Sequence, residues 1–196
     1  ERAYRDMIRT GTTKASVRAV FTDVPELNWF ADNGVEYDPE TVIRFITADT
    51  DMLVLAPSSV WNEVRKIGGS NNYIQFNRHT VWTENGIKFT AVKAEHSDIS
   101  AIGVIIDDGD KKYYVTGDTL YNEEIFADIP KDIYALFLPV NGVGNNMNMT
   151  DAKCFCEKIN PKFAIPIHCG MFDDTDMNKF GYKNKVVPHI YEEIKI

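Results

Sequence analysis

Apolar and polar positions alternate most clearly in the second half of the chain, where they predict a run of β-strands. The strand-like segments are residues 73–76, 79–83, 87–95, 101–107 and 112–116. Short turn sequences such as Glu84-Asn85-Gly86 separate some of them and are typical of hairpins. These strands are therefore expected to pair antiparallel.

Helical and buried-strand patterns flank this run. On its N-terminal side, Asp38-Pro39 predicts the start of a helix to about Ala48, DMLVLA predicts a buried strand over 51–56, and Ser58 or Ser59 caps a helix that ends at Gly68-Gly69. On its C-terminal side the pattern predicts a helix over 118–126, a buried strand over 133–140, a helix capped by Thr150 and a strand over 164–167. The fold class is therefore α/β, with a mixed sandwich favoured over a doubly wound parallel sheet.

Length and charge narrow the function classes. A chain of 196 residues with 44% hydrophobic residues fits a single domain spanning 1–196 with a real core. The formal charge of −8 argues against binding to nucleic acid or to an anionic membrane, which needs clustered positive charge. No apolar run approaches the length of a membrane span, and three cysteines show no disulfide-scaffold spacing. We therefore expect a cytoplasmic protein with reduced thiols.

Three side chains with metal-binding chemistry follow predicted strands. His96 comes after the strand 87–95, Asp118 after 112–116 and His168 after 164–167. Side chains at strand ends project into the crevice where mixed α/β sheets place their sites. Imidazole and carboxylate are the usual protein ligands of Zn²⁺, Fe²⁺ and Mn²⁺, so the three residues form a candidate metal site.

Spacing alone favours a structural role for either histidine and leaves such a role equally open for Asp118. A histidine after a strand is commonly a packing residue, and Asp118 can serve as a turn residue or a helix cap. The two other histidines are expected at the surface: His79 within an alternating strand, and His189 near the C-terminus.

Three segments resemble metal motifs of the metallo-β-lactamase superfamily. They are Glu95-His96-Ser97-Asp98, Thr116-Gly117-Asp118-Thr119 and Ile165-Pro166-Ile167-His168-Cys169-Gly170. The stretch LPVNGVGNNMNMTDA, followed by IPIHCGMF, is similar to the branch of ascorbate-6-phosphate lactonase-like metal-dependent hydrolases. The resemblance runs from about Asp38 to Ile196. It implies an αββα sandwich of mixed sheets in which His96 binds a first metal, Asp118 bridges two metals as the catalytic carboxylate, and His168 binds the second.

The chain departs from this family in its first part. The family's HxHxDH signature has no counterpart, because no histidine precedes His79. Residues 1–37 match the family poorly, so the first half of the sandwich is expected to be truncated or degenerate. Asp23, Asp32, Asn33 and Glu36 offer oxygen ligands for a substitute site, although an acidic loop is more often simply solvated.

The residues around the candidate ligands suggest how a site would be completed. The glycine- and asparagine-rich loop after residue 140 tolerates left-handed backbone and is expected to contact a polar substrate through Asn141, Gly142, Asn145 and Asn146, with a plain structural loop as the alternative. Ser97 and Asp98 are candidates to orient His96, or else form a turn. Cys169 is expected to pack beneath the site.

Three hypotheses follow. The first is a hydrolase that uses a metal-bound hydroxide on a small ester, lactone or phosphoester, with up to two divalent ions, zinc or manganese. The second is a catalytically inactive binding protein of the same fold, because the HxHxDH motif is missing. The third is a mononuclear site of two histidines and one carboxylate, as in non-haem iron enzymes. The expected partner is a small polar or anionic substrate, and assembly into a homo-oligomer would cover sheet surface left exposed by a thin N-terminal half.

Overall fold

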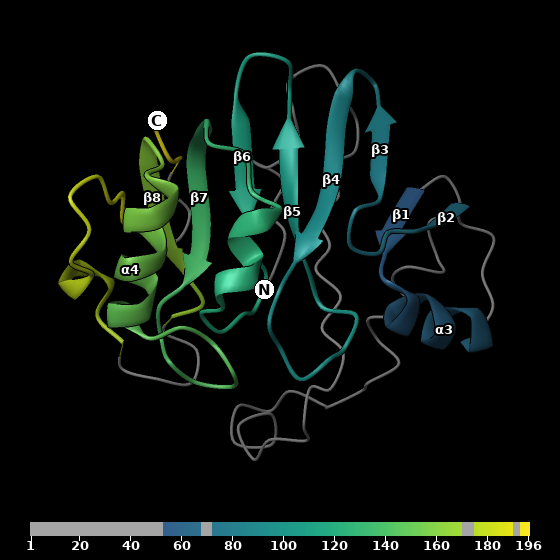
Figure 1. Cartoon of the computed structure of the whole chain (residues 1–196), viewed down its shortest axis with the longest axis horizontal. Helices are drawn as coiled ribbons and strands as arrows, with labels where there is room; N and C mark the ends of the chain where they lie inside the picture. The colour runs from purple at the N-terminus through teal and green to yellow at the C-terminus, as the bar shows by residue number, and fades with distance from the viewer. Residues whose placement is uncertain (1–52, 68–71, 170–174, 190–192) are drawn as a thin grey trace.

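The computed structural model describes residues 53–67, 72–169, 175–189 and 193–196 (Figure 1). In chain order the elements are β1 (Leu53–Ala56), α3 (Ser58–Ile67), β2 (Asn72–Gln75), β3 (Val81–Glu84), β4 (Ile87–Lys93), β5 (Ile102–Asp107), β6 (Lys112–Val115), η2 (Glu123–Ala127), β7 (Ile133–Pro139), α4 (Met149–Ile159), β8 (Phe163–Ile167) and η3 (Met177–Lys179). None of the helices in these ranges is both long and apolar enough to cross a bilayer.

A six-stranded mixed sheet forms the centre of the described structure, in the order β3-β4-β5-β6-β7-β8. Strands β3 to β6 pair antiparallel, as the hairpin pattern predicts, whereas β7 and β8 continue the sheet in parallel with β6. Strands β4, β6, β7 and β8 therefore all run in one direction, and their carboxyl ends lie at the same edge of the sheet (Figure 1). This shared edge brings together residues that are far apart in the sequence.

A second, smaller sheet pairs β1 with β2 in parallel, with α3 between them in the chain. The antiparallel pairing expected for the strand at 73–76 is therefore wrong, because this strand pairs with β1 and not with the run that follows it. The predicted helix is confirmed, but Ser58 and Ser59 lie inside it and do not cap it, because α3 begins at Ser58 and the Pro57 carbonyl already accepts a hydrogen bond of 3.0 Å from the Trp61 backbone N–H. The Asn77 side chain accepts hydrogen bonds from both the backbone N–H and the hydroxyl of Ser58, each at 2.9 Å. The helix start is thus fixed to the segment that leads into the six-stranded sheet.

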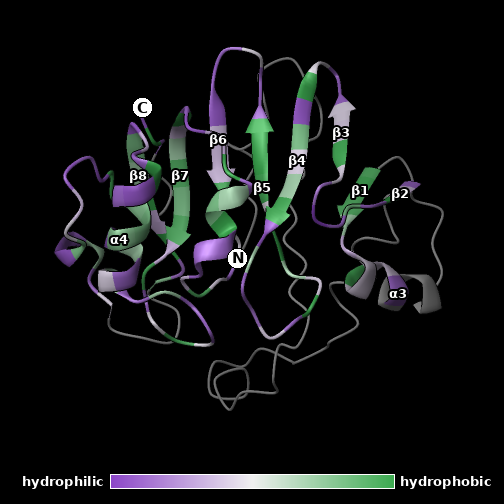
Figure 2. Cartoon of the chain, viewed as in Figure 1, coloured by the Kyte–Doolittle hydropathy of each residue, from purple (hydrophilic) through white to green (hydrophobic). Residues whose placement is uncertain are grey.

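The main core lies between the sheet and α4 (Figure 2). Strand β7 is buried along most of its length because it is a central strand with a helix-covered face. Phe155 on α4 packs against Phe126 and Tyr114, with ring centroids 5.0 and 6.3 Å apart. Burial of these large rings supplies much of the apolar contact that holds the sheet and α4 together.

Three sequence predictions are corrected by the structure. No helix forms over 118–122, because the backbone N–H groups of Thr119 and Leu120 bond to other loops, and only the 3-10 turn η2 follows. The cap of α4 is Asn148 and not Thr150, since the Asn148 carboxamide accepts hydrogen bonds from the backbone N–H groups of Thr150 and Asp151. Strand β3 begins at Val81.

The late start of β3 leaves His79 in a turn, where its φ of +72° is incompatible with a strand. The side chain of His79 is 69% exposed, and His189 is also exposed, so the predicted surface positions of both histidines are confirmed. The Asn85-Gly86 turn has the left-handed backbone of a tight hairpin, as predicted.

Some predictions fall on residues outside the described ranges. These are the helix over 38–48, the helix end at Gly68-Gly69 and the four candidate oxygen ligands Asp23, Asp32, Asn33 and Glu36.

Candidate metal centre

The three predicted ligands lie at the one edge where the equally directed strands end. His96 follows β4, Asp118 follows β6 and His168 directly follows β8. Each side chain therefore leaves the sheet at the same side, although 72 residues separate the first from the last (168 − 96).

Asp118 and His168 come into direct contact. The Nε2 atom of His168 lies 3.3 Å from the Oδ2 atom of Asp118, and each side chain is about one third exposed, at 35% and 36%. The other ring nitrogen of His168 lies 3.0 Å from the carboxamide nitrogen of Asn141, which follows β7. Residues from the ends of three strands thus converge on one imidazole.

His96 lies beside this pair but does not join it directly. Its Nε2 atom is 3.0 Å from the carbonyl oxygen of Gly144, and its Nδ1 atom is 3.2 Å from the hydroxyl of Ser97. Within the described ranges, no group of three or more His, Cys, Asp or Glu side chains stands in a metal-ligating arrangement. The structure therefore brings together two of the three predicted ligands and holds the third against the neighbouring loop.

The electrostatics of Asp118 favour its ionised form. Burial alone would raise the pKa of this carboxyl, but the hydrogen bond and charge of His168 lower it, with further contributions from Asn146 and His96. The pKa of Asp118 consequently lies below its usual range. An ionised carboxylate next to an imidazole is a pair of donors that a divalent cation accepts.

The backbone on both sides of the pair is unusual. His168 has a φ of +61°, a left-handed conformation that costs a non-glycine residue about 1–3 kcal/mol. Gly117, before Asp118, has a φ of +66°, and a Cβ atom there would lie only 3.0 Å from the Ile102 carbonyl oxygen. Strain of this kind persists where the surrounding structure enforces it, commonly at functional sites. Asp118 and His168 therefore fit a metal ion by chemistry and placement, and His96 fits as a further donor if its ring exchanges the Gly144 carbonyl for the ion.

Thr119 holds the elements of the site together. Its side chain is fully buried, and its hydroxyl oxygen accepts a hydrogen bond of 2.8 Å from the backbone N–H of Glu95, next to His96. Its backbone N–H donates to the Asn146 carboxamide at 3.1 Å, and its carbonyl accepts from Met147 at 2.9 Å. Sequence reasoning missed this residue, although its position directly after the metal-motif aspartate was a usable signal.

The loop that follows β7 has the backbone that its composition predicts. Gly142 and Asn145 both have left-handed φ angles, of +70° and +62°. The predicted contact with a substrate stays a prediction for Asn141, Gly142, Asn145 and Asn146. The four residues nevertheless differ from one another in exposure and hydrogen bonding. The Gly142 amide donates to Met147 within the loop, whereas the Asn145 side chain is exposed.

Asn146 is placed to position the site more than to meet a ligand. It is 4% exposed, and its carboxamide accepts from Thr119 while donating to the Val143 carbonyl at 2.9 Å. Both ends of this side chain are therefore used to fix the loop beside Asp118.

The neighbours of His96 and His168 have distinct contacts. Ser97 contacts the His96 ring, as its predicted orienting role requires. Asp98 bonds instead to the Ser59 hydroxyl at 2.6 Å and to the Ser100 backbone at 2.8 Å, which closes a turn and links it to α3. Cys169 is half-buried, and its thiol lies 3.4 Å from the Ile167 carbonyl.

Comparison with solved structures establishes the fold. The chain superposes on the metallo-β-lactamase fold protein YhfI of Bacillus subtilis with a TM-score of 0.60 and 14% identity, over 81% of this chain and 69% of that one. It also superposes on Igni18, a metallo hydrolase of Ignicoccus hospitalis, with a TM-score of 0.55 and 22% identity, over 64% and 57% of the two chains. The protein therefore has an α/β metallo-β-lactamase-like fold, as the sequence motifs implied.

Comparison of sequences finds relatives with higher sequence identity to this chain than the solved structures above. The chain is 36% identical over 130 residues to a UPF0173 metal-dependent hydrolase of Methanocaldococcus jannaschii, covering 57% of this chain and 58% of that protein. It is 32% identical over 138 residues to a UPF0173 metal-dependent hydrolase of Carboxydothermus hydrogenoformans, covering 68% and 59%. The matches thus span less than three fifths of these relatives. No model of a protein family matches the chain.

Proposed function

We propose that this protein is a metal-dependent hydrolase that acts on a small ester, lactone or phosphoester. The contact between His168 and Asp118 at the shared strand edge carries the proposal, because an ionised carboxylate and an imidazole meet there on strained backbone. The names of the UPF0173 relatives, which call them metal-dependent hydrolases, support the same reaction class.

The metal would be held by Asp118 and His168, with His96 as a further ligand. A divalent ion such as zinc or manganese would lower the pKa of a coordinated water from about 15.7 towards 7 and polarise the scissile group. Asp118, which its lowered pKa keeps ionised, would help to hold the metal and orient the nucleophilic water.

The surrounding residues would orient these ligands. Asn141 contacts the His168 ring and Ser97 the His96 ring, so each imidazole has a polar neighbour that can select its tautomer. The loop around Asn145, which contains no lysine or arginine, would contact a small polar substrate through carboxamide groups.

A second candidate is a catalytically inactive binding protein of the same fold. It is favoured by one observation: both ring nitrogens of His96 are engaged by Gly144 and Ser97, so only two predicted ligands meet. This candidate predicts weak metal binding and no turnover.

The two candidates separate in one experiment. The purified chain is loaded with Zn²⁺ or Mn²⁺, its bound metal is measured by elemental mass spectrometry, and hydrolysis of ester, lactone and phosphodiester substrates is followed. We expect bound metal and turnover in the parent, loss of both in His168→Gln, and retention of both in His189→Gln, which changes an exposed histidine. A metal-free and inactive parent would overturn the hydrolase proposal.

A further inference from the structure

A cavity lies at the opposite edge of the six-stranded sheet from the candidate metal centre. Its walls come from the β5–β6 turn, the start of β7 and the segment before β8, and its volume is about 560 Å³. Strands β6, β7 and β8 begin beside this cavity and end at the metal edge, so their length separates the two sites (Figure 1). The cavity is therefore distinct from the hydrolase site.

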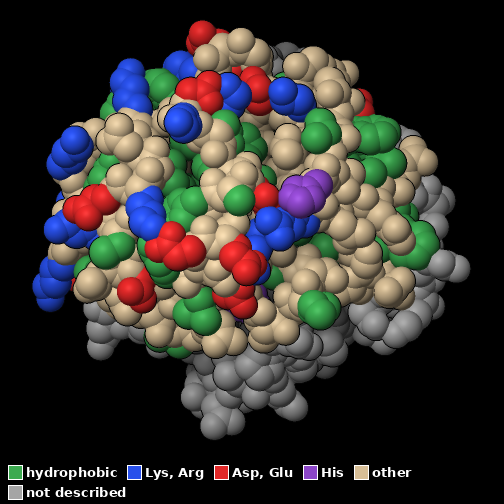
Figure 3. Space-filling view, in the orientation of Figure 1, with side chains coloured by type: hydrophobic (Ala, Val, Ile, Leu, Met, Phe, Trp, Pro, Cys, Tyr) green, Lys and Arg blue, Asp and Glu red, His purple; other side chains and the backbone are tan. Residues whose placement is uncertain are grey.

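Lysine side chains dominate this cavity although the protein as a whole is acidic. Lys111, Lys131, Lys162 and Lys183 line it, against two carboxylates, while the full chain carries a formal charge of −8. In the described part of the chain, Lys131 and Lys183 make no ion pair. Lys and Arg side chains also gather towards β7 and β8 in the space-filling view (Figure 3). The cavity thus concentrates positive charge that internal carboxylates do not neutralise.

An aromatic ring orders two of these lysines. The Nζ atoms of Lys111 and Lys162 lie 4.1 and 4.8 Å from the centre of the Tyr134 ring. Tyr134 in turn packs edge-on against Tyr113 and Phe163, with ring centroids 6.0 and 5.4 Å away. Because cation–π contacts restrict the lysine side chains, less conformational entropy is lost when an anion binds between them.

We propose that this cavity binds a small phosphorylated metabolite carrying two or more negative charges. Four ammonium groups around one cavity suit phosphate oxygens, which accept charge-assisted hydrogen bonds. The volume falls within the range of about 300–1,000 Å³ that is typical of small-molecule sites, so the cavity has room for a ligand larger than a single phosphate ion. A long polyanion is disfavoured because Asp110 and Asp132 flank the lysines and the whole protein is negative.

Binding is tested by titration calorimetry on the metal-free chain, so that the metal centre makes no contribution. The probes are ADP, ribose 5-phosphate, pyrophosphate and the uncharged control adenosine. We expect saturable binding of at least one phosphorylated probe below about 1 mM and none of adenosine. ADP alone would identify a nucleotide site, ribose 5-phosphate a sugar-phosphate site, and pyrophosphate alone a site for the phosphate groups themselves.

A pair of double variants ties the binding to the cavity. Lys131→Gln with Lys183→Gln removes two unpaired charges from the cavity and should weaken binding about tenfold or more. Lys179→Gln with Lys195→Gln removes two exposed charges that do not line the cavity and should leave the affinity within about twofold, since exposed charges without direct ligand contact are screened by salt. Equal affinity in the two double variants, binding of adenosine, or no binding of any phosphorylated probe would overturn the proposal.

Discussion

Two aspartate–histidine pairs in this chain have opposite surroundings. Asp118 pairs with His168 at the strand edge and keeps 36% of its side chain exposed. Asp128, at the end of η2, contacts His79 and is only 7% exposed. The same two residue types thus form an open pair at one place and an enclosed pair at another.

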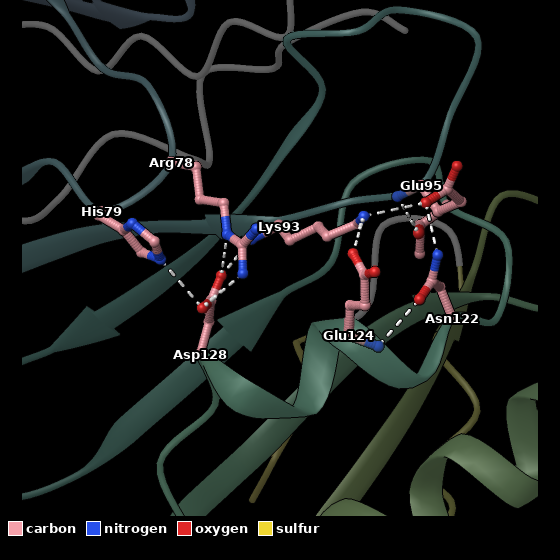
Figure 4. Close-up of polar contacts among 8 residues, drawn as sticks. Arg78, His79, Lys93, Glu95, Asn122, Glu124 and Asp128 are labelled. Atoms are coloured by element: carbon pink, nitrogen blue, oxygen red, sulfur yellow. Dashed lines mark hydrogen bonds and ion pairs between the residues drawn. The ribbon is translucent and has the colours of Figure 1, made fainter.

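The enclosed carboxylate is saturated with donors (Figure 4). Arg78 donates two hydrogen bonds to Asp128, at 2.6 and 2.9 Å, and the Lys93 backbone N–H donates a third at 3.0 Å. Burial alone would raise the pKa of Asp128, but these donors lower it to about 2. With its oxygens occupied, Asp128 ties the turn before β3 to β4 and η2, whereas Asp118 keeps about one third of its side chain exposed to solvent.

The largest expected difference between the pairs is in metal affinity. Asp118→Asn should weaken zinc binding by more than about 100-fold, because even residues that only orient a ligand contribute 10- to 100-fold. Competition with a chromophoric chelator measures this affinity. The matched Asp128→Asn variant should bind zinc as the parent does, and a loss of equal size would show that the two pairs are not functionally distinct.

For the stability of the fold, the larger effect is expected at Asp128 and not at Asp118. Asp128→Asn should lower the free energy of unfolding by about 1.5–3 kcal/mol, because it replaces the charge-assisted hydrogen bonds from Arg78 and from the Lys93 backbone N–H with weaker ones. Urea unfolding followed by circular dichroism measures the change. Glu157→Gln, which alters an exposed pair with Lys153, is the control and should cost less than about 0.5 kcal/mol.

The contribution of Asp128 to the unfolding free energy should also depend on pH. The folded pKa of Asp128, about 2, is depressed from the ordinary 3.8, so its stabilisation is present above about pH 4 and is lost as the pH falls through 2. This contributes about 2 kcal/mol to the decline in unfolding free energy between these values. Asp128→Asn should flatten that part of the profile, and an unchanged slope would assign the decline to other carboxyls.

Substitution of Thr119 should affect both zinc affinity and unfolding free energy, with effects smaller than those of the two aspartate variants. Thr119→Val leaves the partly buried Glu95 N–H without its acceptor and should cost about 1–3 kcal/mol in unfolding free energy. If Thr119 also positions the metal site, folded Thr119→Val should bind zinc more weakly than the parent. Thr119→Ser, which keeps the hydroxyl, should restore the parent's zinc affinity. If serine restored stability alone, Thr119 would be structural without a role at the metal edge.

The smallest effect is expected at His79. Its side chain is 69% exposed, so its contact with Asp128 is screened by water and His79→Gln should change the unfolding free energy by less than about 1 kcal/mol. Thermal unfolding at pH 6 and pH 8 checks this, and a larger loss would place His79 among the groups that hold Asp128.

Much of the architecture followed from local sequence. Alternating residues located β4, β5 and β6, and the Asn85-Gly86 turn specified the hairpin of β3 and β4. The motifs around His96, Asp118 and His168 indicated the fold that comparison confirmed. The pattern did not predict that the residues after Asp118 are non-helical, because the backbone N–H of Thr119 bonds to Asn146, which is distant in the sequence. The pattern also did not predict that Asn148 caps α4, a role that the local hydrogen bond from the Thr150 backbone N–H decides.

The sequence by itself determined which chemical groups follow the strands, since period and turn residues are local properties of the chain. Only the tertiary structure decided which of these groups meet. Strands β6 and β8 run in the same direction within one sheet, which brings Asp118 to His168. His96 instead contacts the backbone carbonyl of Gly144 in the neighbouring loop. Likewise, the role of Asp128 and the lysine-lined cavity depend on residues distant in the sequence, whose contacts arise only when the strands pack.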